Sequence, residues 1–155
     1  MTPAEIAALV SERFGAAVVE VKLDGMNPWI VVAPQSILDV CRFLREDPRL
    51  AMDHLELLGG VDYKDRIEVV YITYSMSQRH RITAKVRLPR EDPRVASVES
   101  IWPVANWHER EAYDMFGVFF EGHSDLRRIL CPDDWEGYPL RKDYKYPTQY
   151  RDMPV

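Results

Sequence analysis

The residues that could do chemistry are concentrated in the stretch from Trp107 to Tyr144. His108 and Glu109 stand side by side there, as a histidine and a glutamate do in zinc proteases. That motif needs a second histidine four positions after the first, so that both imidazoles lie on one face of a helix. Position 112 is alanine, which excludes a zinc protease of this type.

A histidine, a serine and an acid are adjacent at His123, Ser124 and Asp125. A nucleophile-elbow serine has a glycine two positions before it and another two after it. Gly122 supplies the first, but Leu126 occupies the second position, and sequence neighbours rarely converge as a triad. The preferred interpretation is a turn in which Ser124 or Asp125 caps the segment that follows. A free-standing acid–base hydrolase that uses His123 stays an alternative, although nothing indicates a pocket around it.

Metal and cofactor sites are not expected in this chain. An iron–sulfur cluster or a structural zinc ion needs about four close ligands, whereas Cys41 and Cys131 are the only cysteines and lie far apart. The pair Gly59-Gly60 lacks the further glycine and the lysine of a nucleotide loop, and it is interpreted as a turn. We therefore expect no catalytic, cofactor-binding or metal-binding residue, and two inert thiols.

Composition narrows the class of protein. The chain has 155 residues, 46% of them hydrophobic and 29% charged, which is typical of one globular domain. A net charge of −5 argues against binding to nucleic acid, because that function needs a basic surface. No apolar run approaches the roughly 20 residues of a membrane-spanning helix, and the N-terminus does not resemble a signal peptide. The expectation is a soluble protein that is not exported.

Acids and arginines alternate through the same stretch and are interspersed with aromatic residues. Arginine together with tyrosine, tryptophan and phenylalanine is typical of the core of a protein–protein interface. We therefore expect a docking surface, in which Arg127 and Arg128 act as a pair. The candidate docking residues are Glu109, Arg110, Glu111, Asp114, Phe116, His123, Asp125, Arg127, Arg128, Trp135, Leu140, Arg141, Lys142 and Asp143.

The elements that must position this stretch follow from periodicity. Thr2, Pro3 and Glu5 form a helix start, and Gly15 ends that helix. Later apolar patterns predict strands at 18–23, 29–33, 54–58, 67–74 and 81–88, a helix from 36 to before Pro48, and a third helix capped by Asn106 and ended by Gly117. Four prolines between Pro132 and Pro154 predict an extended tail.

The predicted fold class is α+β. The order helix, two strands, helix, three strands indicates a two-layer domain with helices on one face of a mixed sheet, followed by a third helix and the extended C-terminal tail. Residues 1–105 form the α/β part, and residues 106–155 add a helix, a docking loop and the tail to the same single domain.

Three blocks in this stretch resemble the thirty-kilodalton subunit family of respiratory complex I. They read WHEREAYDMFG from Trp107, FEGHSDLRRIL from Phe120 and DWEGYPLRKDY from Asp134, and they cover most of the stretch with consistent spacing. One position departs from the family pattern, because Ser124 stands where the family usually has proline after glycine-histidine. The missing ring frees one backbone angle of that loop.

The resemblance implies a structural subunit in the peripheral arm of a proton-translocating NADH:quinone oxidoreductase, on the cytoplasmic face of the cell inner membrane. It implies that flavin, iron–sulfur clusters and quinone are bound by partner proteins of the complex, and that this chain braces the large quinone-site subunit. The tail from Pro139 onward would lie against that large partner. The equivalent subunit of a membrane-bound hydrogenase or of a ferredoxin-driven complex is the alternative, and an adaptor unrelated to respiration is a third.

Overall fold

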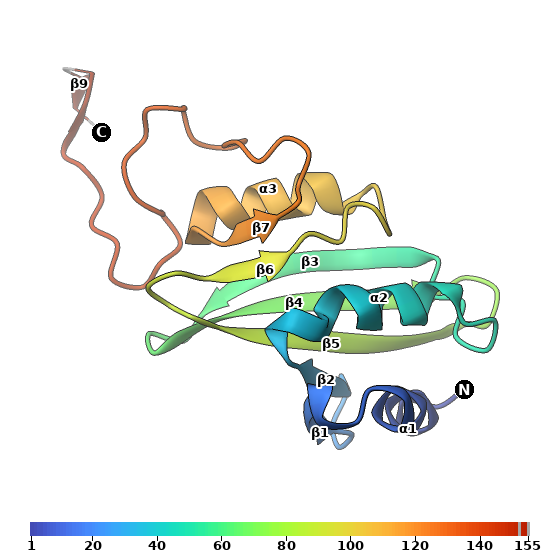
Figure 1. The fold of residues 1–155 in the computed structure, drawn as a ribbon. Coiled ribbons are helices and arrows are strands. Elements are labelled where there is room, and N and C mark those ends of the chain that lie inside the picture. Colours follow the sequence, from blue (N-terminus) through green and yellow to red (C-terminus); the bar gives the residue numbers. More distant parts are fainter. Residues whose placement is uncertain (152, 155) are drawn as a thin grey trace.

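The computed structural model describes residues 1–151, 153 and 154 (Figure 1). The predicted order of elements is confirmed. In chain order the elements are α1 (Pro3–Phe14), β1 (Val18–Lys22), β2 (Trp29–Val32), α2 (Ile37–Glu46), β3 (His54–Asp62), β4 (Arg66–Ser75), β5 (His80–Pro89), β6 (Arg94–Ala96), α3 (Ala105–Phe116), β7 (Phe119–Glu121), β8 (Gln149–Tyr150) and β9 (Met153–Pro154).

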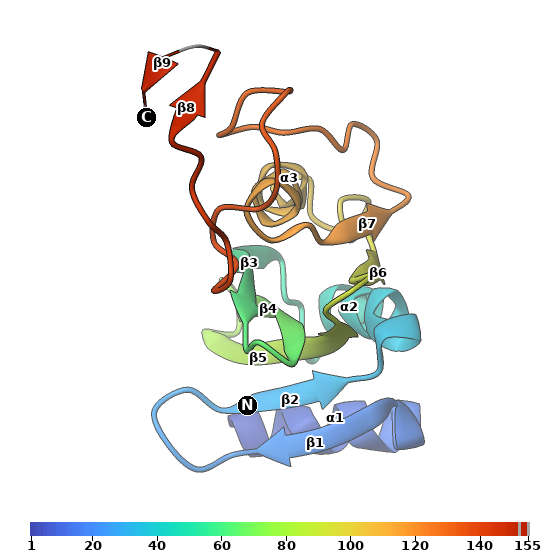
Figure 2. The same cartoon turned by 90° about the vertical axis from the view of Figure 1, so that its left-hand side faces the viewer.

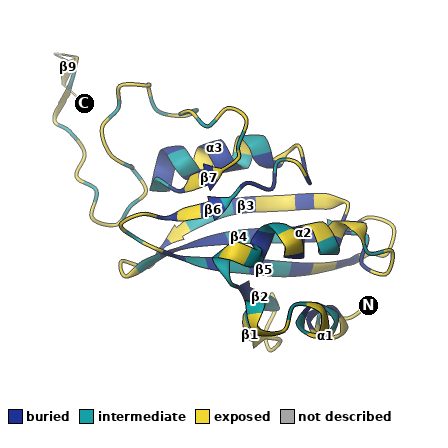
Figure 3. Ribbon diagram, viewed as in Figure 1, coloured by how far each residue is buried: buried dark blue, intermediate teal, exposed yellow. Residues whose placement is uncertain are grey.

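One five-stranded sheet forms the centre of the fold, in the order β1-β2-β5-β4-β3. The β2–β5 pair is parallel and the other pairs are antiparallel, so the sheet is mixed, as predicted. The alternation along β5 is also confirmed, because Ile82, Ala84, Val86 and Leu88 are buried (Figure 3). These side chains join the apolar residues of α1 and α2 in one core cluster, which fixes the helices on one face of the sheet.

The start of α1 follows from its first residues. Thr2 Oγ1 accepts a hydrogen bond from the Glu5 N–H at 3.3 Å, and the Glu5 carboxylate accepts one from the Thr2 N–H at 2.7 Å. This reciprocal capping box satisfies two backbone donors that have no partner within the helix. Gly15 ends α1 with a φ of 51°, as its position in the sequence predicts.

The predicted cap of α3 is wrong. The cap position is Val104, two residues before Asn106, so the helix begins at Ala105, and the Asn106 side chain donates to Glu99 Oε1 at 2.8 Å instead. The turn before α3 is set by Trp102, whose buried indole N–H donates to the Met52 carbonyl at 2.9 Å. Tertiary packing of this ring, rather than a side-chain cap, therefore determines where α3 starts.

The predicted turn at Gly59-Gly60 is also wrong, because β3 continues through both glycines to Asp62. Helix α3 lies along this edge strand, where His108 Nδ1 accepts the Leu58 N–H at 3.1 Å. A Cβ atom on Gly60 would lie only 2.6 Å from Cδ2 of Phe116, the last residue of α3. Glycine is thus needed at position 60 for the close approach of helix and strand.

The two glycines provide a matched test of this packing. Gly60→Ala is expected to lower the free energy of unfolding by about 1–3 kcal/mol, because its methyl group overfills the contact with the Phe116 ring. Gly59→Ala serves as the control, since its Cβ would meet Leu57 at an ordinary 3.7 Å. Urea denaturation of both variants measures the difference. Equal stabilities would contradict the assigned role of Gly60.

Candidate partner-docking site

Asp114 is the buried centre of the stretch that the sequence singled out. One of its oxygens, Oδ2, accepts the backbone N–H groups of Ile129, Leu130 and Cys131 at 3.0, 2.7 and 2.8 Å. The other, Oδ1, accepts from Arg128 Nη1 at 2.6 Å. Burial by itself raises the pKa of Asp114, but these donors outweigh it and hold that pKa below its usual range. The charged carboxylate of this α3 residue therefore fixes the loop that follows β7, residues 122–131.

Arg128 connects the same carboxylate to residues 135–137, which follow the loop. Its guanidinium donates to the Asp114 carboxylate and to the carbonyls of Trp135 and Gly137, at 2.6, 2.8 and 2.9 Å. The side chain is only 13% exposed, whereas that of Arg127 is 67% exposed and pairs with Asp125. The expected docking pair Arg127 and Arg128 therefore divides into a surface residue and an internal one.

Arg110 holds the loop from a second point on α3. Its Nε and Nη2 donate to the carbonyls of Arg127 and Arg128, both at 3.2 Å. The guanidinium also lies 5.2 Å from the centre of the exposed Trp107 ring. Both backbone groups and side chains of the loop are thus oriented by α3.

Glu109 lies on the buried side of α3, against the segment that leads into the helix. Its carboxyl group accepts from Ser97 Oγ at 2.6 Å and from the Val98 N–H at 2.7 Å. Burial raises the pKa of this carboxyl to about 7, although the two hydrogen bonds act in the opposite direction. Glu109 is therefore an internal polar contact and presents no charge to a partner.

Both ring nitrogens of His123 have hydrogen-bonding partners within the chain. Its Nδ1 accepts the Asp125 N–H at 3.0 Å and its Nε2 lies 3.1 Å from the Asn106 carbonyl, while the ring is fully buried. The expected turn is present, but the segment after it is irregular and Ser124 instead bonds Glu99 at 2.7 Å. A ring with both nitrogens occupied and without solvent contact does not fit the hydrolase alternative.

The residues after the loop form an extended segment, 132–151, which we call the arm. It returns to the end of the sheet near β3 and then leaves the body toward β8 and β9 (Figures 1 and 2). Arg90 bridges Asp62 at 3.0 Å and Asp143 at 2.9 Å, while Asp62 also accepts the Lys142 N–H at 2.8 Å. Arg90 first, and then the backbone donors, lower the pKa of Asp62 below its usual range.

The structure thus separates the fourteen candidate docking residues by burial. Glu109, Arg110 and Asp114 are buried and contact groups of the same chain, so in this conformation they are not available to a partner. Phe116, Arg128, Trp135 and Arg141 are partly exposed, and His123 is exposed only outside its buried ring. The exposed candidates, for which a docking role stays a prediction, are Glu111, Asp125, Arg127, Leu140, Lys142 and Asp143.

Several residues that anchor the arm or lie exposed beside it are absent from the fourteen candidates predicted from the sequence. Asp62 and Arg90 anchor the arm from β3 and from the residue after β5, yet neither belongs to a recognisable motif. Exposed Trp107, Leu130 and Tyr146 are apolar candidates for a partner contact. The mixture of aromatic and charged residues had already singled out the stretch that begins at Trp107, and following the same pattern two positions further would have included Tyr146.

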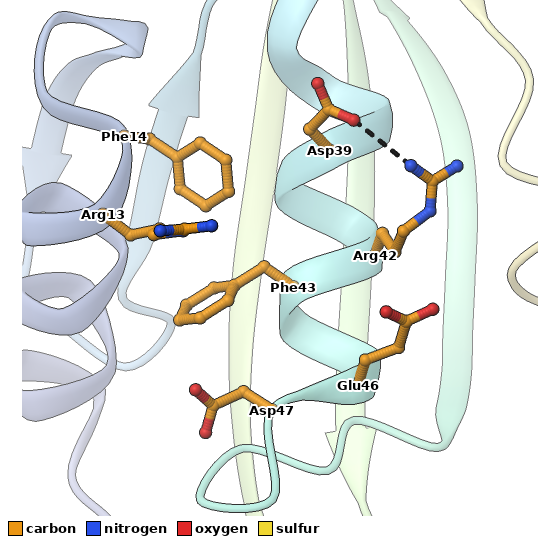
Figure 4. A pocket seen from close by; sticks show the side chains of 7 residues that line it. All are labelled: Arg13, Phe14, Asp39, Arg42, Phe43, Glu46 and Asp47. Carbon is orange, nitrogen blue, oxygen red and sulfur yellow. Dashed lines mark hydrogen bonds and ion pairs between the residues drawn. The ribbon is translucent and has the colours of Figure 1, made fainter.

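The remaining features of the described residues concern metal ligands, thiols, one pocket and helix length. Residues 1–151, 153 and 154 contain no group of three or more histidines, cysteines or acids that could hold a metal ion, and both thiols are free. An open pocket lies between α1 and α2, where the rings of Phe14 and Phe43 meet edge to face at 5.6 Å (Figure 4). No helix in the described part of the chain is long and apolar enough to cross a bilayer.

The central carboxylate gives a direct stability test. Asp114→Asn is expected to lower the free energy of unfolding by about 3 kcal/mol, because it breaks a buried ion pair and leaves Arg128 without its counter-charge. Asp125→Asn is the matched control, since its exposed pair with Arg127 contributes about 0–1 kcal/mol. Chemical denaturation at pH 7 compares the two. A smaller loss at position 114 than at position 125 would contradict the assignment.

Glu109 predicts a pH dependence. Its pKa in the folded protein, about 7, lies above the ordinary value of 4.5. The contribution of this group to stability is therefore complete below the ordinary value and is lost as pH rises through about 7. Glu109→Gln, which stays neutral, is expected to reduce the fall in stability between pH 5 and pH 8. Denaturation midpoints of both proteins across this range measure it, and parallel curves would refute the role of Glu109.

Comparison with known proteins identifies relatives over most of the chain. Residues 30–150 match the family described as "Respiratory-chain NADH dehydrogenase, 30 Kd subunit". The C-type subunit of NADH-quinone oxidoreductase from Chloroherpeton thalassium is 48% identical over 95% of this chain and 62% of its own length. The corresponding protein of Chlorobium phaeobacteroides is 44% identical over 95% of this chain and 91% of its own length. The chain thus spans less than two thirds of the first relative.

Solved structures agree with these matches. A trypsin-resistant fragment of Nqo5 superposes with a TM-score of 0.70 at 27% identity, over 81% of this chain and all of the fragment. A chain of the membrane-bound sulfane sulfur reductase, an archaeal respiratory membrane complex, gives a TM-score of 0.72 at 28% identity, over 92% of this chain and 85% of its own length. The resemblance of the three sequence blocks is confirmed, and the chain belongs to the family of the 30 kDa subunit of respiratory-chain NADH dehydrogenase, also called complex I.

Proposed function

We propose that the chain is a non-catalytic structural subunit in the peripheral arm of a proton-translocating NADH:quinone oxidoreductase. It braces the large quinone-site subunit while electrons pass from NADH to quinone. The observation that carries this proposal is a contrast between the buried charges of the stretch from Trp107 to Tyr144 and the exposed apolar side chains of the arm. Its buried charges are used to fasten the arm, while the arm directs Leu140 and Tyr146 outward, 52% and 63% exposed.

The energetics of the charged residues support a bracing role. Removing a carboxylate such as Asp114 from water is costly unless every lone pair finds a donor, and here four groups donate to it. Such an arrangement holds its loop in one conformation. A rigid loop and arm reduce the entropy that is lost when a partner binds, which favours a stable contact.

The partner proposed for the arm is the large quinone-site subunit, with other proteins of the peripheral arm beside it. Flavin, iron–sulfur clusters and quinone would then be bound by those partners, on the cytoplasmic face of the membrane. The commitment of His123 and Glu109 to internal hydrogen bonds supports a chain that contributes contacts rather than acid–base chemistry.

A second candidate is the equivalent subunit of another membrane-bound respiratory complex. The likeness to a chain of the archaeal sulfane sulfur reductase favours it, because that match covers 92% of this chain. The two candidates differ in the electron donor. Recovery of flavin- and nucleotide-binding subunits with this chain supports NADH as donor, and their absence supports a ferredoxin- or hydrogenase-type complex.

Co-purification from native membranes tests the proposed partner contact. A tagged chain is expected to recover the large quinone-site subunit after mild solubilisation. The variant Leu140→Asp with Tyr146→Asp should recover several-fold less, because each exposed apolar side chain at an interface centre contributes about 1–2 kcal/mol. Its melting temperature should stay within about 2 °C of the parent, since both side chains are exposed.

Met26→Asp is the matched control for this experiment. Met26 is also apolar and is 88% exposed, but it lies in the β1–β2 loop, away from the arm (Figure 2). It should leave recovery unchanged. Failure of the parent chain to recover a large quinone-site subunit would refute the proposed function, and equal losses for both variants would refute the role of the arm.

A further inference from the structure

We propose that three glycines form seats for aromatic rings and so fix the path of the arm before any partner binds. Each of Gly60, Gly117 and Gly137 lies directly beneath the aromatic ring of a residue that comes later in the chain. The proposal rests on the proposed function only in supposing that the arm is the part that docks. The order of the isolated arm can be measured without a partner.

The first two seats connect the sheet, α3 and the first part of the arm. The Phe116 ring covers Gly60 of β3, where a Cβ atom would lie 2.6 Å from its Cδ2. The Tyr138 ring covers Gly117 just after α3, where a Cβ atom would lie 2.5 Å from its Cε2. Real Cβ atoms do not approach rings this closely, so each ring position requires glycine below it.

The third seat lies entirely within the arm. The Tyr144 ring covers Gly137, where a Cβ atom would lie 2.7 Å from its Cε2. The Tyr144 hydroxyl donates to the Glu136 carbonyl at 3.1 Å, and the ring meets Tyr146 edge to face at 5.0 Å. The position of exposed Tyr146 therefore depends on how Tyr144 is seated.

An arginine contacts the Tyr138 ring and also binds the end of α3. The Arg141 guanidinium lies 4.8 Å from the centre of the Tyr138 ring and donates to the Phe116 carbonyl at 2.7 Å. The Leu140 N–H donates to the Met115 carbonyl at 3.1 Å. Two hydrogen bonds to α3 thus lie between the seated rings of Tyr138 and Tyr144, and together these contacts fix the direction of residues 138–144 relative to α3.

Backbone conformation alone does not explain the glycines. Gly117 and Gly137 have φ of +75° and +77°, and Gly122 has φ of +82°. Within the described residues, a Cβ atom on Gly122 would meet nothing within 4 Å. Gly122 therefore shares the left-handed backbone without the ring, and it is a matched control. Asparagine tolerates this backbone region, so glycine-to-asparagine changes add a Cβ atom with little backbone strain.

Hydrogen exchange of the full 155-residue chain tests the proposal. The reporters are the N–H groups of Leu140, Lys142 and Tyr144, which donate to Met115, Asp62 and Arg141. Gly137→Asn is expected to speed exchange at Lys142 and Tyr144 by about tenfold or more, because the displaced ring releases the segment. Gly122→Asn should leave these amides unchanged. Exchange is preferred to proteolysis, since exposed Lys142 and Lys145 offer trypsin cleavage sites even in a seated arm.

Gly137 lies outside the apolar core, so we expect Gly137→Asn to fold. A change in exchange then reports on the arm and not on global unfolding. Gly117→Asn is the second variant, with faster exchange expected from Leu140 onward. If the parent amides already exchange at unstructured rates, or if Gly137→Asn and Gly122→Asn behave alike, the proposed seats are refuted. Recovery of the large quinone-site subunit, measured separately, distinguishes this failure from failure of the proposed function.

Discussion

The structure of the stretch from Trp107 to Tyr144 depends on the buried carboxylate of Asp114. A carboxylate inside a protein is stable only when its lone pairs find donors, and α3 provides none for a side chain at this position. The loop supplies them instead, as three consecutive N–H groups and the Arg128 guanidinium. Because these donors must all reach the two carboxylate oxygens of Asp114, the loop has little freedom to adopt another path.

Further constraints follow from this one. Once Arg128 is held by Asp114, its remaining N–H groups fix the carbonyls of Trp135 and Gly137. Gly137 is then placed beneath Tyr144, and the arm meets the sheet where Arg90 joins Asp62 to Asp143. A charge in the last turn of α3 is thereby connected to an exposed segment far along the chain. This connection gives a physical reason for an alternating pattern of acids and arginines that would otherwise resemble a solvated surface.

The sequence predicted the fold well where the signal was local. The capping residues at Thr2 and Glu5, the alternation along 81–88 and the stop at Gly117 each depend on residues within a few positions of one another. The predictions failed where a distant side chain decided the outcome. Gly59-Gly60 has the composition of a turn, but the strand continues because Phe116 packs against Gly60. Asn106 has the chemistry of a cap, but the packing of Trp102 moves the start of the helix.

The sequence by itself determined the α+β class, the order of the elements and the family, since these depend on periodicity and on motifs with fixed spacing. It also located the stretch that matters. Only the tertiary structure decided which of its charges are internal and which face outward, because burial depends on contacts that sequence distance does not reveal. Arg127 and Arg128 are neighbours of one type, yet the first is exposed and the second is enclosed by α3 and the loop. The two arginines differ because only Arg128 is paired with the buried carboxylate of Asp114.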